Sequence, residues 1–393
     1  MKVERKLLIT RTVWVLSFVS LFTDIASEML YPVMPVYLRS IGFSVLLIGI
    51  LEGIAEATAG LSKGYFGNVS DLRMKRIPFI RAGYTISAIA KPLLALFTYP
   101  FWILGVRTME RLGKGIRTGA RDAVLSAESD TTTKGKVFGL HRGMDTLGAA
   151  IGPALALLFL FYYPGKYRLL FLLALIPGLL AVWLTILLKE PKKKQKIVQK
   201  KWPGFLAFIQ FLKHADPVYK KLVYGLWFFT LFNSSDIFLL LMLKFTGLAD
   251  LQVIGVYIFY NIVYALFAYP FGVLGDKIGL KYTLMFGTFI FSLVYAGMVL
   301  VSGLYWFLLI FLFYGIYAAS TESIAKAWIS NLVKTKETAT AIGTYDAFRS
   351  LATLIASVTA GILWTGFGPE LTFMVSAIAA LITFLYIGLA VKS

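Results

Sequence analysis

The feature that most constrains this chain is a short motif that occurs once in each half. The first copy, GNVSDLRMKR, begins at Gly67, and the second, GVLGDKIGLK, begins at Gly272. Each copy follows a long apolar segment, and in each an aspartate stands four residues after the glycine and just before a basic cluster. A charged turn repeated between apolar helices, once per half, predicts a duplicated helical membrane protein.

The composition supports a membrane location. Hydrophobic residues make up 58% of the 393 residues and charged residues only 15%, whereas a soluble domain carries about a quarter charged residues. Crossing a bilayer takes about 20 apolar residues. Suitable segments lie at residues 13–38, 44–66, 77–98, 100–124, 136–162, 167–189, 220–243, 250–271, 282–303, 305–332, 340–364 and 369–390. We therefore expect an all-α membrane protein with twelve transmembrane helices in two pseudo-symmetric six-helix bundles.

One long connection divides the predicted spans. We expect an N-terminal bundle over 1–189, a cytoplasmic basic linker over 190–219 and a C-terminal bundle over 220–393. The beginning of the linker is a basic tether. The stretch from Trp202 to Lys213 can form a short amphipathic helix on the inner leaflet.

The net charge is +19, and the positions of the basic residues indicate the membrane topology. Basic residues gather in alternate loops, which predicts that both termini and the central linker face the cytoplasm across the cell membrane. This pattern favours contact with anionic lipids over binding of nucleic acid. The chain has no cysteine, and its one intramembrane histidine lacks a metal-ligand spacing. We expect no cofactor, no bound metal and a monomeric protein.

The chain resembles the major facilitator superfamily over its whole length. The resemblance rests on twelve spans, a basic central loop and G-x-x-x-D followed by basic residues in both the 2–3 and 8–9 turns. The first copy departs from the family form at Leu72 and Met74. A further motif, G-x-x-x-G-P at Gly148, Gly152 and Pro153, is similar to one in proton-driven exporters of this superfamily. The glycines expected after Pro153 are missing.

The resemblance implies a secondary active transporter that moves a small molecule by alternating access, not an enzyme. We expect proton coupling and export of an organic anion, a metal chelate or an amphipathic compound. A lipid, lysolipid or hydrophobic-drug transporter and an uncoupled facilitator remain alternatives. A membrane-embedded transferase would belong to a different class, but the sequence contains no D-D-x-x-D motif.

Ionisable residues at bilayer depth indicate the site, since each costs about 2.5–3.5 kcal/mol to insert. Neighbouring carboxylates in a medium of low dielectric do not both ionise cheaply, so one can carry a proton. The proton-coupling candidates are Asp24, Glu28, Glu52, Glu56, His141 and Asp145. Arg107, Arg111 and Lys114 fall on one helix stripe that favours an anionic group. The substrate-cavity candidates are Arg107, Glu110, Arg111, Lys114, Asn233, Asp236 and Asn261. Alternatively, these acids and bases only neutralise one another.

The repeated motif predicts a cytoplasmic gate. We expect Asp71 to meet Arg117, Arg121 and Asp122 near the positive N-terminus of the helix over 340–364, and so to latch the outward-facing state. The gate candidates are Gly67, Asp71, Arg73, Lys75, Arg117, Arg121, Asp122, Gly272, Asp276, Lys277 and Lys281. A passive cluster at the lipid headgroups is the alternative. Gly148, Gly152 and Pro153 are expected to allow close helix packing and a bend.

Overall fold

The computed structural model describes residues 9–190, 202–234 and 236–391, and within them the secondary structure is helical. The helices before the linker are α1 (Arg11–Glu28), α2 (Met34–Ser40), α3 (Val45–Arg73), α4 (Ile77–Leu93), α5 (Pro100–Ala127), α6 (Lys134–Tyr162), α7 (Tyr167–Leu173) and α8 (Leu175–Thr185). The second bundle contains α10 (Pro217–Phe232), α11 (Asp236–Phe245), α12 (Asp250–Ile278), α13 (Leu280–Leu300), α14 (Leu304–Asn331), α15 (Thr338–Phe367) and α16 (Pro369–Ala390).

These helices correspond to the twelve predicted spans, three of which are interrupted. The span over 13–38 is divided into α1 and α2, where Pro35 occupies the first turn of α2 and has no backbone N–H to bond. The span over 167–189 is divided into α7 and α8, and that over 220–243 into α10 and α11. On length and composition alone, eight of the described helical segments can cross a membrane, all of them from α6 onwards. The first four spans correspond to α1–α5, where most of the candidate ionisable residues lie.

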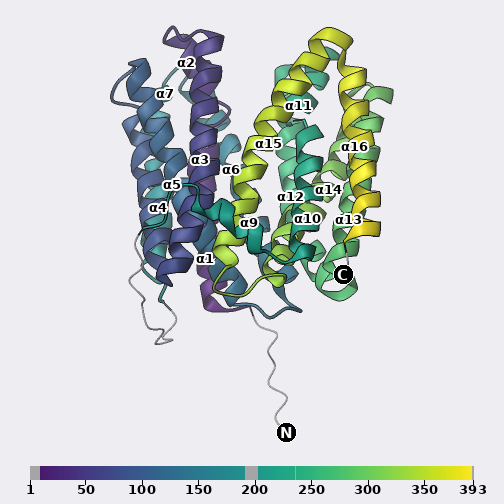
Figure 1. Cartoon of the computed structure of the whole chain (residues 1–393). Coiled ribbons are helices and arrows are strands. Elements are labelled where there is room, and N and C mark those ends of the chain that lie inside the picture. The colour runs from purple at the N-terminus through teal and green to yellow at the C-terminus, as the bar shows by residue number, and fades with distance from the viewer. Residues whose placement is uncertain (1–8, 191–201, 235, 392–393) are drawn as a thin grey trace.

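The two bundles have equivalent internal packing. Helix α3 packs on α5 as α12 packs on α14, and α4 packs on α5 as α13 packs on α14. Between the bundles, α6 packs on α12 and α3 packs on α15, which are the two symmetry-related contacts. Figure 1 shows the bundles side by side, with the start of α1 and the end of α16 toward the lower end. The fold is therefore a pair of pseudo-symmetric six-helix bundles.

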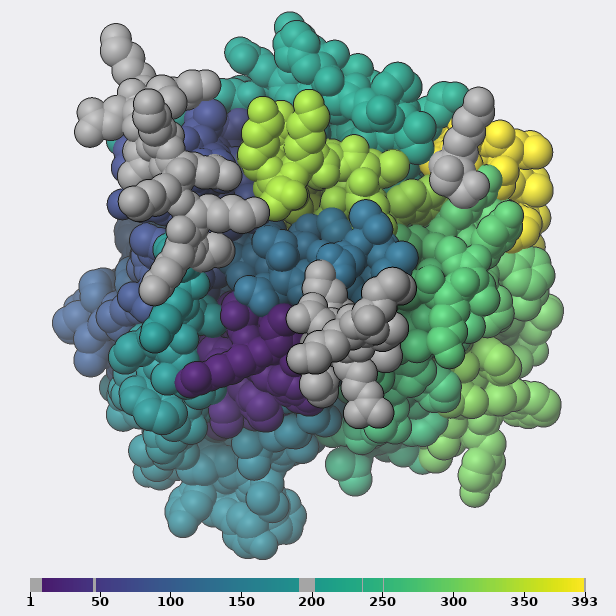
Figure 2. All heavy atoms as spheres, turned by 90° about the horizontal axis from the view of Figure 1, so that it is seen from below, coloured from purple at the N-terminus to yellow at the C-terminus, as the bar shows by residue number. Residues whose placement is uncertain are grey.

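Glycines let the bundles approach closely at this lower end. A Cβ atom added to Gly272 of α12 would lie 2.2 Å from the carbonyl oxygen of Gly135 in α6. A Cβ atom added to Gly67 of α3 would lie 2.4 Å from the carbonyl oxygen of Ala339 in α15. From below, side chains of both bundles meet across this face (Figure 2). We call it the closed end; it is the side that the charge pattern predicts to be cytoplasmic.

The connection between the bundles differs from the predicted helix over 202–213. It forms a short 3₁₀ turn, η1 (Ala207–Ile209), and the five-residue helix α9 (Gln210–His214). The Phe208 ring is buried against Gly64 of α3, and the Thr344 hydroxyl of α15 donates a 3.3 Å hydrogen bond to the Phe208 carbonyl. The segment therefore lies against both bundles, because Gly64 leaves room for the ring. The predicted basic tether, 191–201, lies outside the described residues.

Candidate functional site

A cavity of about 420 Å³ lies mainly among the helices of the second bundle. Tyr31, Pro32 and Pro153 of the first bundle also line it. Two of the predicted cavity residues, Asn233 and Asp236, are in its wall, at the break between α10 and α11. Asn261 is not among the lining residues; it is buried and donates a hydrogen bond to the Tyr257 carbonyl.

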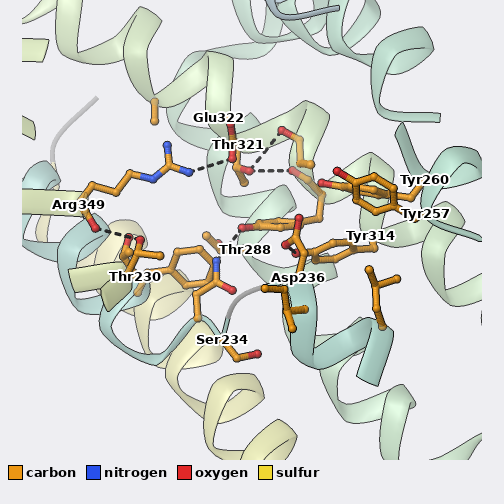
Figure 3. Close-up of a pocket in the computed structure, with 18 of the residues that line it drawn as sticks. Thr230, Ser234, Asp236, Tyr257, Tyr260, Thr288, Tyr314, Thr321, Glu322 and Arg349 are labelled. Carbon is orange, nitrogen blue, oxygen red and sulfur yellow. Dashed lines mark hydrogen bonds and ion pairs between the residues drawn. The ribbon is translucent and has the colours of Figure 1, made fainter. Parts of the chain in front are cut away.

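Tyrosines form one side of the cavity (Figure 3). The rings of Tyr260 and Tyr314 pack with centroids 4.9 Å apart, and Tyr317 follows at 5.4 Å from Tyr314. The Tyr314 hydroxyl donates a 2.5 Å hydrogen bond to a carboxylate oxygen of Asp236. The aromatic wall and the acid therefore form one continuous surface of the cavity.

Three charged residues that were not among the candidates connect the bundles. Glu322 of α14 accepts from Arg349 at 2.9 Å within its own bundle and forms an ion pair with Arg142 of α6 at 2.6 Å. Arg142 also contacts Asp145 at 2.7 Å and donates to the Tyr264 hydroxyl at 2.6 Å. The sequence contained a signal for these residues. VFGLHRGMD from Val137 aligns with AIGTYDAFR from Ala341, which places Asp145 opposite Arg349, and Arg142, Glu322 and Arg349 are all ionisable residues within predicted spans.

Two predicted proton carriers meet between α1 and α6. The side chains of Asp24 of α1 and Asp145 of α6 lie next to each other, and the Ser20 hydroxyl donates to Asp145. Gly148 makes this approach possible: a Cβ atom there would lie 2.5 Å from the Leu21 carbonyl oxygen and 3.0 Å from the Asp24 Cβ.

Gly152 allows the same close approach one helical turn later, against the Ile25 carbonyl of α1, and α6 continues as a helix through Pro153. His141 lies earlier on α6 and is buried. Its Nε2 makes no hydrogen bond within the described segments of the chain.

The other predicted acids of the first bundle pair with the basic stripe on α5. Arg107 contacts Glu52 and Glu110 at 2.7 Å each, and Arg111 contacts Glu56 at 3.0 Å. These acids and bases pair with one another, which is the geometry expected if they only neutralise each other's charge.

Two charges beside the stripe are different. Among the described residues, neither Glu28 nor the exposed Lys114 forms a direct ion pair, although the two are near enough to interact electrostatically. Both line a smaller hollow with Arg111 and Tyr31, and Tyr31 also lines the larger cavity.

The two motif aspartates make equivalent contacts across the closed end. Asp71, at the end of α3, accepts from the backbone N–H and the hydroxyl of Thr340 in the first turn of α15, at 2.7 and 2.9 Å. Asp276, at the end of α12, accepts from the backbone N–H groups of Gly135 and Lys136 in the first turn of α6, at 2.7 Å each. Each motif thus caps a helix of the opposite bundle.

The partners of Asp71 differ from those predicted. Its basic partner is Arg76 at 2.8 Å, and Arg76 also donates to the Thr335 carbonyl of the other bundle. Arg117 instead points toward α4, where it donates to Ser87 and stacks over Tyr84. Successive positions on α5 face different helices as the helix turns. Arg117 and Asp122, which were predicted to meet Asp71 together, therefore contact different partners.

Asp122 forms a separate link between the bundles. It contacts Arg121 at 2.9 Å and Lys326 of α14 at 2.7 Å.

The remaining gate candidates lie at the edges of the closed end. Arg73 stacks over the Trp202 ring at 4.1 Å, and Lys281 donates to the carbonyls of Gly388 and Val391 at the end of α16. Lys75 and Lys277 are exposed.

Two six-helix bundles, with a cavity lined by residues of both, have the architecture of a membrane transporter. The chain belongs to the major facilitator superfamily: the model described by that name matches residues 16–260 and 238–392. It is therefore an integral membrane protein that carries a small molecule, not an enzyme.

Relatives and solved structures agree with this assignment. The chain is 34% identical to an MFS-type transporter of Methanocaldococcus jannaschii over 381 residues, which is 95% of this chain and 94% of that one. A human organic anion transporter has a similar fold, with a TM-score of 0.76, 17% identity and coverage of 96% of this chain and 99% of that one. The E. coli fucose:proton symporter also scores 0.76, with 11% identity and coverage of 97% and 98%.

Proposed function

We propose that the protein is a proton-coupled exporter that moves a molecule with an anionic group across the cell membrane by alternating access between its two bundles. The observation that carries this proposal is the contact between Asp24 and Asp145, which Arg142 joins to Glu322 of the other bundle. The contact combines a place for a proton with a connection between the moving bundles.

The carboxyl pair supplies the proton site. Two carboxyl groups in contact away from bulk water hold one proton between them, since two adjacent negative charges repel. When a proton reaches Asp145, its charge-assisted bond to Arg142 weakens. Arg142 also holds Glu322 of α14, so protonation of Asp145 changes how Arg142 is shared between the two bundles and shifts the balance between the closed and open states.

The anionic group of the substrate would bind at the basic stripe of α5. Lys114 is exposed there and forms no ion pair within the described residues, and the Arg111 Nε is buried without a hydrogen-bond partner. The neighbouring fold described as an organic anion transporter supports this substrate class. The resemblance of Gly148, Gly152 and Pro153 to the exporter motif favours export.

The test uses purified protein in proteoliposomes with an imposed pH gradient. A thermal-shift screen of organic anions first selects a transported probe, since a ligand of the folded form raises its apparent stability. The gradient should drive that probe across the membrane. Asp24→Asn and Asp145→Asn should each abolish the gradient-driven component while probe-for-probe exchange continues.

Asp130→Asn, an exposed aspartate near the closed end, is the matched control and should behave as the unchanged protein. Gradient-driven transport that survives in both Asp24→Asn and Asp145→Asn would show that the proton site lies elsewhere. Exchange without any response to the gradient in the unchanged protein would indicate an uncoupled facilitator.

A further inference from the structure

We propose that the cavity of the second bundle binds an ammonium group between Asp236 and the tyrosine wall, so that the transported molecule carries a positive end as well as an anionic one. This inference deepens the proposed function and rests on it for the anionic end. The ligand class is a zwitterion in which a protonated or quaternary amine is separated from a carboxylate or similar group.

Asp236 is an acid without a resident counter-ion among the described residues. Its side chain is exposed in the cavity wall and accepts one hydrogen bond, from Tyr314 at 2.5 Å. No basic side chain of the described segments forms an ion pair with it. An unpaired carboxylate at bilayer depth is costly, and a bound cation would relieve that cost.

The other charges of the cavity are already satisfied. Glu322 and Arg349 form an ion pair at 2.9 Å, and Glu322 has a second basic partner in Arg142 at 2.6 Å. These residues therefore neither supply Asp236 with a counter-ion nor compete strongly for a ligand charge. The charge that an incoming molecule meets at this end of the cavity is that of Asp236.

The tyrosine wall adds a second feature that favours a cation. Tyr257, Tyr260, Tyr314 and Tyr317 all line the cavity, and Figure 3 shows Asp236 beside the Tyr314 ring. A cation within about 6 Å of an aromatic face is attracted by the ring quadrupole. One ring of the same row already receives a cation: Arg142 lies 5.2 Å from the centroid of Tyr264, which packs 6.1 Å from Tyr260.

The position of the cavity fits a molecule with two charged ends. Tyr31 lines both this cavity and the smaller hollow that contains Arg111 and Lys114. The two spaces are therefore neighbours. The smaller is lined by four basic and three acidic side chains, and the larger has an unpaired acid and aromatic rings. A zwitterion can place its anionic end against α5 and its ammonium group against Asp236.

The experiment compares three probes built on one benzene ring. These are benzoate, benzyltrimethylammonium and para-carboxybenzyl-trimethylammonium, which carries both charges. Binding to the full-length purified protein in detergent is measured by calorimetry. We expect the doubly charged probe to bind most tightly. Asp236→Asn should weaken its binding and that of benzyltrimethylammonium by about ten- to a hundredfold, with benzoate unchanged.

Two further variants make the result specific. Lys114→Gln should weaken benzoate and the doubly charged probe but not benzyltrimethylammonium, whereas Asp130→Asn should alter none of the three. Equal affinity of the unchanged protein and Asp236→Asn for benzyltrimethylammonium would overturn the inference. So would an Asp236→Asn protein whose binding is normal but whose transport has lost its pH dependence, since Asp236 would then be a proton site.

The failure of this inference is distinguishable from failure of the proposed function. If benzyltrimethylammonium binds through Asp236 but no probe responds to a pH gradient, the result supports the ammonium site and contradicts proton coupling. If gradient-driven transport of benzoate is observed and Asp236→Asn has no effect on any probe, coupling stands and the ammonium site falls.

Discussion

At the residue scale, Asp71 and Asp276 perform the same task in opposite directions. Each accepts hydrogen bonds from N–H groups in the first turn of a helix that belongs to the other bundle. Those N–H groups have no partner within their own helix, and the helix end carries a partial positive charge. A carboxylate is therefore well suited to hold the closed end together.

We predict that Asp71→Asn and Asp276→Asn each favour opening of the closed end. Asparagine keeps the shape but loses the charge and one acceptor oxygen, at a cost of about 1 kcal/mol, which corresponds to roughly a fivefold change in the closed-to-open ratio. Because the chain has no cysteine, spin labels can be attached specifically at Thr132→Cys and Lys334→Cys. Distances between the labels should shift toward longer values.

The double variant Asp71→Asn/Asp276→Asn should shift the label distances further than either single change, as independent sites do. Glu370→Gln, in the first turn of α16, serves as the control and should leave the distances unchanged. Closed-end distances that stay the same in the double variant would show that the caps do not set the equilibrium.

The sequence indicates the existence of this gate better than its partners. The repeated aspartates were evident because both stand at the same place in the motif. Arg76, the partner of Asp71, stands in the motif itself, whereas Lys326 as the partner of Asp122 depends on which faces of α5 and α14 turn toward each other. The spacing of residues in a sequence shows which side chains share a helix face. It does not show which neighbouring helix that face contacts, and so the ion-pair partner cannot be predicted.

At the scale of elements, the contact between α6 and α12 depends on a pair of glycines. A Cβ atom on Gly272 would lie 2.2 Å from the backbone of Gly135, which is too close for any rotamer change to relieve. Close helix contact through small residues is a general device in membranes, where apolar surface alone does not hold helices together.

We predict that Gly272→Ala opens the closed end, since α6 and α12 must separate to accommodate the methyl group. The matched control is Gly255→Ala in the same helix, where an added Cβ atom meets nothing within 4 Å. That change should be neutral or stabilising, because alanine suits a helix better than glycine by up to about 1 kcal/mol. Spin-label distances and thermal stability together measure both effects; identical behaviour of the two variants would contradict the prediction.

Most elements were predictable because their apolar length is dictated by the bilayer. The twelve spans and the single long connection follow from hydropathy and charge. Hydropathy did not predict the breaks that follow α1, α7 and α10 or the shape of the linker, because these features depend on tertiary packing. Phe208, for example, is one of several aromatics in its segment, and Gly64 lies far away in the sequence.

At the scale of the whole molecule, the linker contacts both bundles at the closed end. We predict that Phe208→Ala removes a brace between α3 and α15 and so favours opening. Replacing a buried phenylalanine by alanine costs about 3–5 kcal/mol of stability in a well-packed core. The part of this packing energy that only the closed state has determines how far the closed-to-open equilibrium shifts. Spin-label distances across the closed end measure the shift.

Phe205→Ala, which removes a more exposed ring from the same segment, is the comparison for Phe208→Ala and should have a smaller effect. If both variants lower thermal stability equally and leave the label distances unchanged, Phe208 contributes to stability without distinguishing the two states.

The exchange of caps between the bundles also suggests how such a protein can originate. A six-helix ancestor would need one such aspartate and one helix whose first-turn N–H groups are unbonded. Two identical copies could then each donate and accept these hydrogen bonds. Two copies facing each other would then form the pair of contacts seen here at Thr340 and Gly135. Gene fusion would only have to join partners that already fitted together.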